Sequence, residues 1–340
     1  MKDQRSLFEY EFHMDKMDKI GDPLLKMRDL IPWENLFRKS LEKIFRNDKE
    51  AKGPGGRPSY DSVLMFKILI LQKSYGLSDE EMEYQINDRL SFQRFLSLGL
   101  SDTVPDARTI WLYKEKLKEN GDFKLLFNKF QAYLENKGLV AYKGIIVDAT
   151  FVEVPKQRND RDENKEIKEG KQPEEWSDKK AMHKDMDARW MKKDGKSYYG
   201  YKNHVKADKK SKLIMSYTVT DASTHDSQAL ETLLDRKDRG HEIYGDSAYR
   251  STKIEKMLAR KGIRSRIHVK GYRSNSMTKA DMAMNRKKSK TRARVEHIFG
   301  HIQKSMGDFI RSIGKSRAEV NIGLMNMAYN MERCMFLMRT

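Results

Sequence analysis

The first part of the chain, from about residue 23 to residue 140, has its apolar residues at helical spacing. Strand-like alternation of apolar and polar positions is scarce there. One helix is predicted over Ser59–Ser74, after a Gly/Pro cluster at 53–58, with an inner stripe of Val63, Phe66, Ile70 and Leu71. This pattern predicts an all-α N-terminal domain, which we place at residues 1–140.

A glycine turn joins this helix to the next one. Gly76 and Leu77 form the turn, and Ser78 begins a helix with Glu81 three residues later, which is the spacing of a capping box. Asp106 is predicted to cap a further helix. Two helices joined by a tight turn are compatible with a helix-turn-helix DNA reader, but a short helical hairpin has the same pattern. The cations of this region that are available for phosphates, or are simply solvated surface charges, are Arg57, Lys67, Lys73, Arg89, Arg94 and Arg108.

The pattern changes near residue 143, where KGIIVDATFVEV is an apolar, β-branched run that predicts a buried strand. SYYGYKNHVKAD and KLIMSYTVT predict two more strands, joined by a polar turn at Asp208–Ser211. The remaining elements are helices at Asp226–Lys237, Ser251–Lys261, 290–306 and 317–338, with strands at HEIYGD and RSRIHVK. Together they predict an α/β fold, a mixed sheet flanked by helices, in a second domain at residues 141–340.

Residues 155–197 interrupt this second domain. They are rich in charge and poor in aliphatic residues, with NDRDENKEIKEGKQPEE at their centre, and such a composition predicts a flexible excursion on the surface. Around the end of this segment, aromatic and basic residues are interleaved, which favours either stacking on unpaired bases or packing of strand aromatics. These residues are Trp190, Tyr198, Tyr199, Tyr201, Lys192, Lys193, Lys196 and Lys202.

Two aspartates end predicted strands of the second domain. Asp148 follows the apolar run Ile145–Val147, and Asp246 ends the run Ile243–Asp246. Open α/β sheets place ligand-handling residues at strand ends. Carboxylates rarely lie in such apolar surroundings unless they are paired, hydrogen-bonded or bound to a metal. The alternative for each aspartate alone, a cap on the following turn or helix, is common.

A third carboxylate, Glu296, lies on the helix predicted at 290–306. Steps of four residues place Arg292, Glu296, Gly300 and Lys304 along one face, so the carboxylate has cations on both sides and a glycine beside it. A DNA phosphate can approach such a face closely. A surface salt-bridge ladder has the same spacing, and the helix alone does not separate the two interpretations.

The three carboxylates are candidates for one metal site. Asp148, Asp246 and Glu296 offer oxygen ligands and no thiol, a set that suits Mg²⁺ or Mn²⁺. Two such ions can activate an attacking oxygen and stabilise the leaving oxygen in an in-line displacement at phosphorus, without a covalent intermediate. We therefore predict that these three residues are catalytic and bind metal.

The charge balance narrows the class of partner. The 340 residues include 68 Lys+Arg against 50 Asp+Glu, a net charge of +18, which indicates a polyanionic partner such as nucleic acid. No apolar run approaches the roughly 18 residues of a membrane-spanning helix. The first residues lack the apolar segment of a secretory signal. We therefore expect a cytoplasmic, nucleoid-associated protein rather than a membrane protein.

Three smaller features are interpreted as structural. The single cysteine, Cys334, lies in the Met-rich end at 325–338, where it is expected to fill the core rather than act as a nucleophile. His297 and His301 are four residues apart, but no second Cys or His pair accompanies them, so zinc is not expected. His225 is expected to cap the helix that follows it.

Five stretches of the second half, in this order, carry a family resemblance: VDATFVE, ARWMKKDGKSYYGYKNH, VTDASTHDSQALETLL, YGDSAYRS and RARVEHIFGHIQK. In the helical half, the stretches from RPSYDSVLMFKILILQKSYGLSDEEMEYQINDRLSFQRFLSLGL to PDARTIW add to it. Over about residues 55–305 the chain resembles the DDE transposases of bacterial insertion sequences, in the group typified by insertion sequence five.

The resemblance implies a ribonuclease H-like catalytic core with the metal-binding acids at Asp148, Asp246 and Glu296. It also implies cleavage of double-stranded DNA at inverted terminal repeats by water, followed by attack of the freed 3′-hydroxyl on target DNA, in a homodimer or larger oligomer. Related transposases often carry a Tyr, Arg, Glu, Lys series around the last acid. Here Arg292 matches and Ser289 stands where the Tyr would be, while the Lys is one residue beyond its usual place.

The function expected from the sequence is therefore DNA transposition. A catalytically silent, transposase-derived DNA-binding protein or repressor is the alternative, because the same charge and helices support it, and a structure-selective nuclease is a third. The intact acidic trio favours the enzyme. The side chains expected to contact DNA are Arg292, Arg294, Lys304, Lys202, Tyr201, Arg57, Arg94 and Arg108.

Overall fold

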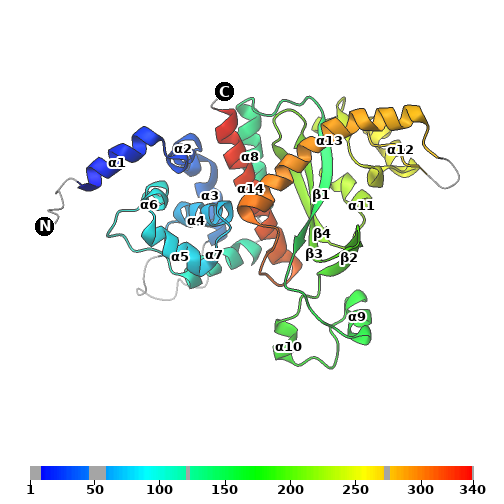
Figure 1. The fold of residues 1–340 in the computed structure, drawn as a ribbon. Helices are drawn as coiled ribbons and strands as arrows, with labels where there is room; N and C mark the ends of the chain where they lie inside the picture. The colour runs from blue at the N-terminus through cyan, green and yellow to red at the C-terminus, as the bar shows by residue number, and fades with distance from the viewer. Residues whose placement is uncertain (1–8, 46–58, 120–122, 272–275, 339–340) are drawn as a thin grey trace.

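Helices build the first part of the protein, as the sequence predicts (Figure 1). The structure is a computed structural model and describes residues 9–45, 59–119, 123–271 and 276–338. The N-terminal helices are α1 (Glu9–Ile20), α2 (Pro23–Leu30), α3 (Trp33–Phe45), α4 (Ser62–Ser74), α5 (Asp79–Asp88), α6 (Leu90–Leu96), α7 (Ala107–Glu119) and α8 (Phe123–Asn136). The helical character predicted for this region is confirmed.

Side-chain caps determine where several of these helices begin. The Ser78 hydroxyl accepts a hydrogen bond from the backbone N–H of Glu81 at 3.1 Å, and the Glu81 carboxylate accepts one from the N–H of Ser78 at 2.8 Å, so the predicted capping box is confirmed. The predicted cap at Asp106 is also present. Helix α4 begins at Ser62 rather than at residue 59, because the Asp61 carboxylate caps it. The Gly/Pro cluster before it lies outside the described residues.

A six-stranded mixed sheet forms the second part. Its strands are β1 (Ile145–Glu153), β2 (Arg189–Lys193), β3 (Lys196–Asp208), β4 (Ile214–Asp221), β5 (Glu242–Tyr244) and β6 (Arg264–Ser265). Strand β3 is antiparallel to β1, β2 and β4, whereas β5 is parallel to β1 and to β6. The hairpin predicted at Asp208–Ser211 joins β3 to β4. The predicted mixed α/β fold is confirmed.

Alternation along β1 assigns the flanking helices to the two faces of the sheet. Ile145 and Val147 point into a core formed with α11 (Asp226–Leu233) and α12 (Thr252–Arg260). Ile146 points to the opposite face, which α13 (Lys279–Met306) and α14 (Lys315–Leu337) cover. The last two helices match the predicted ones, although α13 begins about a dozen residues earlier than expected. None of the helices in the described ranges is both long and apolar enough to cross a membrane.

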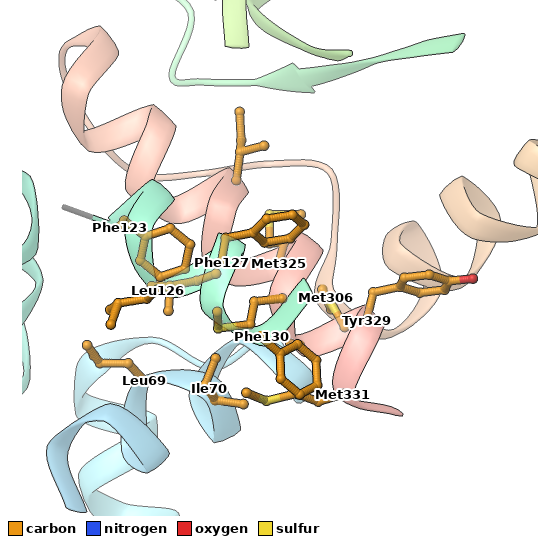
Figure 2. Close-up of a cluster of buried hydrophobic side chains, with 14 of the residues drawn as sticks. Leu69, Ile70, Phe123, Leu126, Phe127, Phe130, Met306, Met325, Tyr329 and Met331 are labelled. Carbon is orange, nitrogen blue, oxygen red and sulfur yellow. The ribbon is translucent and has the colours of Figure 1, made fainter. Parts of the chain in front are cut away.

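Helix α14 lies between the N-terminal helices and the sheet, so one cluster of buried side chains continues across both parts of the chain (Figure 1). Figure 2 shows Phe127 and Phe130 of α8 beside Met325 and Met331 of α14. The Met-rich end therefore closes the core, as predicted. Cys334 is buried there, and burial raises the pKa of its thiol to about 11, which disfavours the nucleophilic thiolate.

Gly323 marks the closest approach of α14 to its neighbours. A Cβ at this position would lie 2.4 Å from the Tyr217 hydroxyl oxygen and 2.5 Å from Cδ1 of Phe123. We expect Gly323→Ala to lower the free energy of unfolding by about 1–3 kcal/mol through overpacking, even though alanine favours helix. Urea unfolding measures this. Gly300→Ala is the control, because a Cβ on Gly300 meets nothing within 4 Å. Equal stability of the two variants would contradict the packing described.

The segment at 155–197 has more structure than its composition predicts. It contains α9 (Arg161–Lys168) and α10 (Asp178–Met182), which project from the end of the sheet, and it ends in β2 (Figure 1). Glu163 holds the two helices together: its carboxylate accepts hydrogen bonds from Nε1 of Trp176 at 2.6 Å and from Nζ of Lys180 at 2.5 Å. The sequence predicts a flexible excursion here, and the structure shows helices within it that one buried tryptophan and one buried carboxylate organise.

Candidate active site

Asp148 of β1 and Asp246, which follows β5, lie beside each other in the sheet. Strands β1 and β5 are parallel, with Ile146 opposite Tyr244. The same register, continued by two residues, places Asp148 opposite Asp246 with both side chains on one face. Gly245 lets the chains approach here, since a Cβ on it would lie 3.2 Å from Cγ2 of Val147. Folding therefore brings the two predicted aspartates together, although Asp148 lies within β1 and only Asp246 follows the end of its strand.

Asp148 is largely buried and is hydrogen-bonded to the neighbouring backbone. Its side chain is 15% exposed, and Oδ1 accepts a hydrogen bond from the backbone N–H of Ala149 at 2.9 Å. Burial raises the pKa of the Asp148 carboxyl to about 6, and the negative charge of Asp246 adds to this, while the Ala149 N–H and the charge of Arg292 oppose it. A carboxylate in this environment is stabilised by a cation placed beside it.

Asp246 has a structural role as well. Its Oδ1 accepts a hydrogen bond from the N–H of Ala248 at 2.8 Å and so caps the short 3₁₀ turn at Ser247–Tyr249. The capping alternative considered for this residue is thus present. Within the described ranges no hydrogen bond reaches Oδ2 of Asp246, which leaves that oxygen available to a ligand. One side chain can therefore serve both purposes.

Glu296 joins the pair through an arginine rather than directly. Its side chain is 64% exposed on α13, and Oε1 lies 3.5 Å from Nη2 of Arg292. Nη1 of the same guanidinium lies 3.4 Å from Oδ2 of Asp148. Arg292 therefore stands between the two carboxylates. Among the described residues, no three His, Cys, Asp or Glu side chains lie close enough together to hold a metal ion.

The predicted cationic face of α13 is open to solvent. Glu296, Gly300 and Lys304 are exposed along it, as the four-residue spacing requires. Arg294 is exposed as well, and its Nη1 donates to the carbonyl oxygen of Lys209 at 2.8 Å. This face has the exposure and the charge that phosphate contact needs.

Two predicted DNA contacts on β3 are buried instead. Tyr201 is 0% exposed, and its hydroxyl donates to the carboxylate of Asp185 at 2.8 Å. Lys202 is 5% exposed, and its Nζ lies 2.9 Å from Oδ1 of Asp226. The prediction that these two side chains contact DNA is wrong for this conformation. Strand β3 is covered on both faces, so its polar side chains are neutralised inside the protein.

The cations of the helical half differ in their accessibility. Arg108 on α7 is exposed. Arg94 is mostly buried, with an ion pair to Asp18 and a second to Asp22 at 3.7 Å. Arg57 lies outside the described residues. Helix α5, the second helix of the candidate helix-turn-helix, is acidic, which favours the helical-hairpin alternative over a DNA reader at this position; its acids are Asp79, Glu80, Glu81, Glu83 and Asp88.

Sequence reasoning missed Tyr249. The side chain is fully buried, and among the described residues its hydroxyl has no hydrogen-bond partner. Burial raises its pKa well above the ordinary value, and the negative charges of Asp148, Asp226 and Asp246 add to the effect. An unpaired hydroxyl is therefore held neutral beside the aspartate pair. In the sequence, this tyrosine has no feature that separates it from an ordinary core aromatic.

Two comparisons with known families agree with this geometry. Residues 141–331 match the transposase DDE domain family, and residues 12–116 match a second family described as a transposase domain (DUF772). The first match covers more than half of the chain, which therefore belongs to the transposase DDE domain family. Family and strand order together make the sheet half a ribonuclease H-like core, as the sequence predicts.

A solved structure is also similar to this chain. It is the piggyBac transposase synaptic complex with hairpin DNA, determined by cryo-electron microscopy. The similarity covers 93% of this chain and 75% of that one, with 12% sequence identity and a TM-score of 0.44.

Proposed function

We propose that this protein is a DNA transposase that cleaves and joins DNA strands with Asp148, Asp246 and Glu296. The meeting of Asp148 and Asp246 on neighbouring strands is the observation that carries the proposal. Metal-dependent displacement at phosphorus needs several oxygen ligands for the metal ions close together. The sheet provides two of them, the carboxylates of Asp148 and Asp246, at a partly buried position. Arg292 links the third, Glu296, to the same point.

The residues present fit a divalent cation. Asp148, Asp246 and Glu296 supply only oxygen donors, and burial, with the nearby charge of Asp246, raises the pKa of Asp148, so a cation beside it would stabilise its carboxylate. These three side chains would hold Mg²⁺ or Mn²⁺, in our proposal two ions. A bound divalent cation would activate the attacking oxygen and stabilise the leaving one.

Arg292 would change partners when DNA binds. Its contacts to the two carboxylates are long, at 3.4 Å and 3.5 Å, and its buried Nε has no hydrogen-bond partner among the described residues. Release of this guanidinium would free Asp148 and Glu296 as ligands and make a cation available to a backbone phosphate. The side chain of Glu296 is exposed enough to turn towards the pair.

DNA would lie along the exposed face of α13. Arg294 and Lys304 on that helix, and Arg108 on α7, are the accessible cations among those predicted from the sequence. We propose that a helical domain at residues 1–140 binds the inverted terminal repeats and that a catalytic domain at 141–340 cuts them. The partners are the element ends and target DNA, bound by a homodimer or larger oligomer in the bacterial cytoplasm. We also propose membership of the group typified by insertion sequence five.

DNA affinity is expected to fall steeply with salt, because phosphate contacts release counterions. If six phosphates are contacted, affinity should drop roughly 10³-fold between 50 and 200 mM salt. Fluorescence anisotropy with a terminal-repeat duplex measures the slope. The double variant Arg294→Ala/Lys304→Ala should make the slope shallower by about 2. Lys253→Ala/Lys256→Ala, which removes two exposed lysines of α12, outside the helical domain and the α13 face, is the control. A salt-independent affinity would refute phosphate contact.

Cleavage of the DNA that flanks the gene tests the proposed function. A supercoiled plasmid carrying both flanks should be nicked at the repeats only with Mg²⁺ or Mn²⁺, and the new 3′-ends should then join to target DNA. A silent repressor would bind the repeats without nicking them. A nuclease would nick without joining. Either result would overturn the transposase proposal.

A further inference from the structure

A groove beneath the α9–α10 segment has no part in the site described above. It is a hollow of about 1070 Å³ between α9, β2 and the beginning of β3. Three cations of α9 line it, Arg161, Lys165 and Lys168, and Trp190 and Tyr199 line it from the strands. Its lining also includes Arg189 and two acids, Asp162 and Asp185. A cavity of this size, lined by cations and aromatic side chains, suits an elongated anionic ligand that carries flat rings.

The three cations form one row on α9. They are spaced by four and three residues, which places them on the same side of the helix. All three are exposed, and within the described ranges none forms an ion pair. Nearby cations of the segment differ, because Lys180 pairs with Glu163 and Lys171 with Glu169. Like charges without ion-pair partners repel one another, and an anionic ligand bound beside them would offset this repulsion.

Trp190 presents a ring to the groove. Its side chain is 47% exposed, while Tyr199 directly opposite on β3 is buried and backs it, with ring centroids 4.9 Å apart. The groove walls are also fixed to each other, because Nη2 of Arg189 on β2 donates to the carbonyl oxygen of Ile167 on α9 at 3.1 Å. The ring is therefore held in place before any ligand arrives.

The groove lies on the same face of the sheet as the aspartate pair. Asp148 is opposite Val205 on β3, and Tyr199 is an even number of residues from Val205, so both tyrosine and aspartate point to one side. Six residues of strand separate these two positions along β3, roughly 20 Å at about 3.3 Å per residue. The residues of β3 between these two positions on this face, Tyr201, Asn203 and Val205, are buried, so a DNA strand would pass from the aspartates to the groove around the end of the sheet and not across this face.

We propose that this groove binds an unpaired stretch of DNA, with a base stacked on Trp190 and backbone phosphates on Arg161, Lys165 and Lys168. A duplex hides the faces of its bases, whereas an unpaired strand offers them, so the exposed ring selects single-stranded DNA. An acidic peptide would use the cations and leave the ring without a role. The inference rests on the proposed function, since strand cleavage at DNA ends is what would supply the unpaired strand.

Binding of a single-stranded oligonucleotide to the full chain, without divalent metal, tests the groove. Trp190→Ala should weaken binding roughly 5- to 150-fold, the range for loss of one base–aromatic stack, whereas Trp190→Phe should retain most of the affinity. The triple variant Arg161→Ala/Lys165→Ala/Lys168→Ala should make the salt slope shallower by about 2. Lys179→Ala, an exposed lysine of the same segment outside the groove, should change neither quantity.

Duplex-end binding by the same variants separates this inference from the proposed function. If the groove serves an unpaired strand, Trp190→Ala should leave affinity for a blunt duplex unchanged. Equal single-strand affinity in Trp190→Ala and the unsubstituted chain would overturn the inference. So would equally tight binding of a poly-glutamate peptide. The triple variant changes only exposed side chains, so its result stands even if Trp190→Ala fails to fold. Failure of the proposed function would instead appear as absent metal-dependent nicking.

Discussion

Asp148→Asn is expected to reduce metal-dependent nicking roughly a thousand-fold or more, because Lewis-acid stabilisation of the transition state is worth several kcal/mol. The amide removes one negative charge from the position where β1 lies beside the end of β5. Binding of terminal-repeat duplex should remain largely intact, since the buried side chain contributes little to phosphate contact. Nicking of a supercoiled plasmid at saturating protein measures the effect.

The same loss is expected for Asp246→Asn and Glu296→Gln, since all three acids act as a unit. Glu231→Gln is the matched control, because Glu231 is exposed on α11 and outside the site. It should nick at the rate of the unsubstituted protein. Undiminished nicking by any one of the three variants would remove that residue from the active site.

Asp148→Asn is also expected to stabilise the metal-free fold, by about 3 kcal/mol at neutral pH. Burial raises the pKa of this carboxyl from 3.8 to about 6, and each pKa unit corresponds to about 1.4 kcal/mol. The folded pKa lies above the unfolded one, so the folded state binds the proton more tightly. Its stability therefore decreases as pH rises from about 4 to about 6 and stays low above that range.

Urea unfolding of both proteins across this pH range, with chelator present, measures the difference. The asparagine variant carries no titrating group at this position, so its advantage should be full above about pH 6 and should vanish below about pH 4. A variant less stable than the unsubstituted protein at neutral pH, or a difference independent of pH, would show that burial does not raise the pKa of Asp148.

The two aspartates were predictable because burial and charge conflict at both. Asp148 follows three apolar residues that favour a buried strand, and Asp246 ends the run Ile243–Asp246. A carboxylate there requires compensation, which makes each a candidate before any contact is known. Capping positions such as Ser78 and Asp106 were predictable for a similarly local reason, since the spacing of donor and acceptor is set within one turn.

The bridging position of Arg292 was not predictable, because it depends on how α13 crosses β1. Helical spacing places this arginine beside Glu296, and only the packing of helix on sheet places it beside Asp148 as well. Whether the carboxylates contact each other directly or through a guanidinium therefore depends on tertiary packing and not on local sequence. The sequence identifies the participants without their arrangement.

The errors on β3 have a physical origin too. Tyr201 and Lys202 were expected to contact DNA because aromatic and basic residues are interleaved in this segment, although packing of the strand aromatics was the alternative. Here α11 covers one face, and buried ion pairs neutralise the polar side chains: Lys206, like Lys202, is buried and lies 3.0 Å from Asp238. The order within 155–197 was missed for the complementary reason, since one tryptophan and one glutamate among many charges are enough to organise it.

Binding of Mn²⁺ to the intact protein, followed by electron paramagnetic resonance, tests the central claim most directly. The account predicts that the unsubstituted chain binds Mn²⁺ and that Asp148→Asn and Asp246→Asn each lose roughly ten-fold or more in affinity, the range for removal of a metal-site partner. Glu231→Gln should bind as the unsubstituted chain does. Unchanged Mn²⁺ affinity in both aspartate variants would contradict the account, because the paired carboxylates would then not form a metal site.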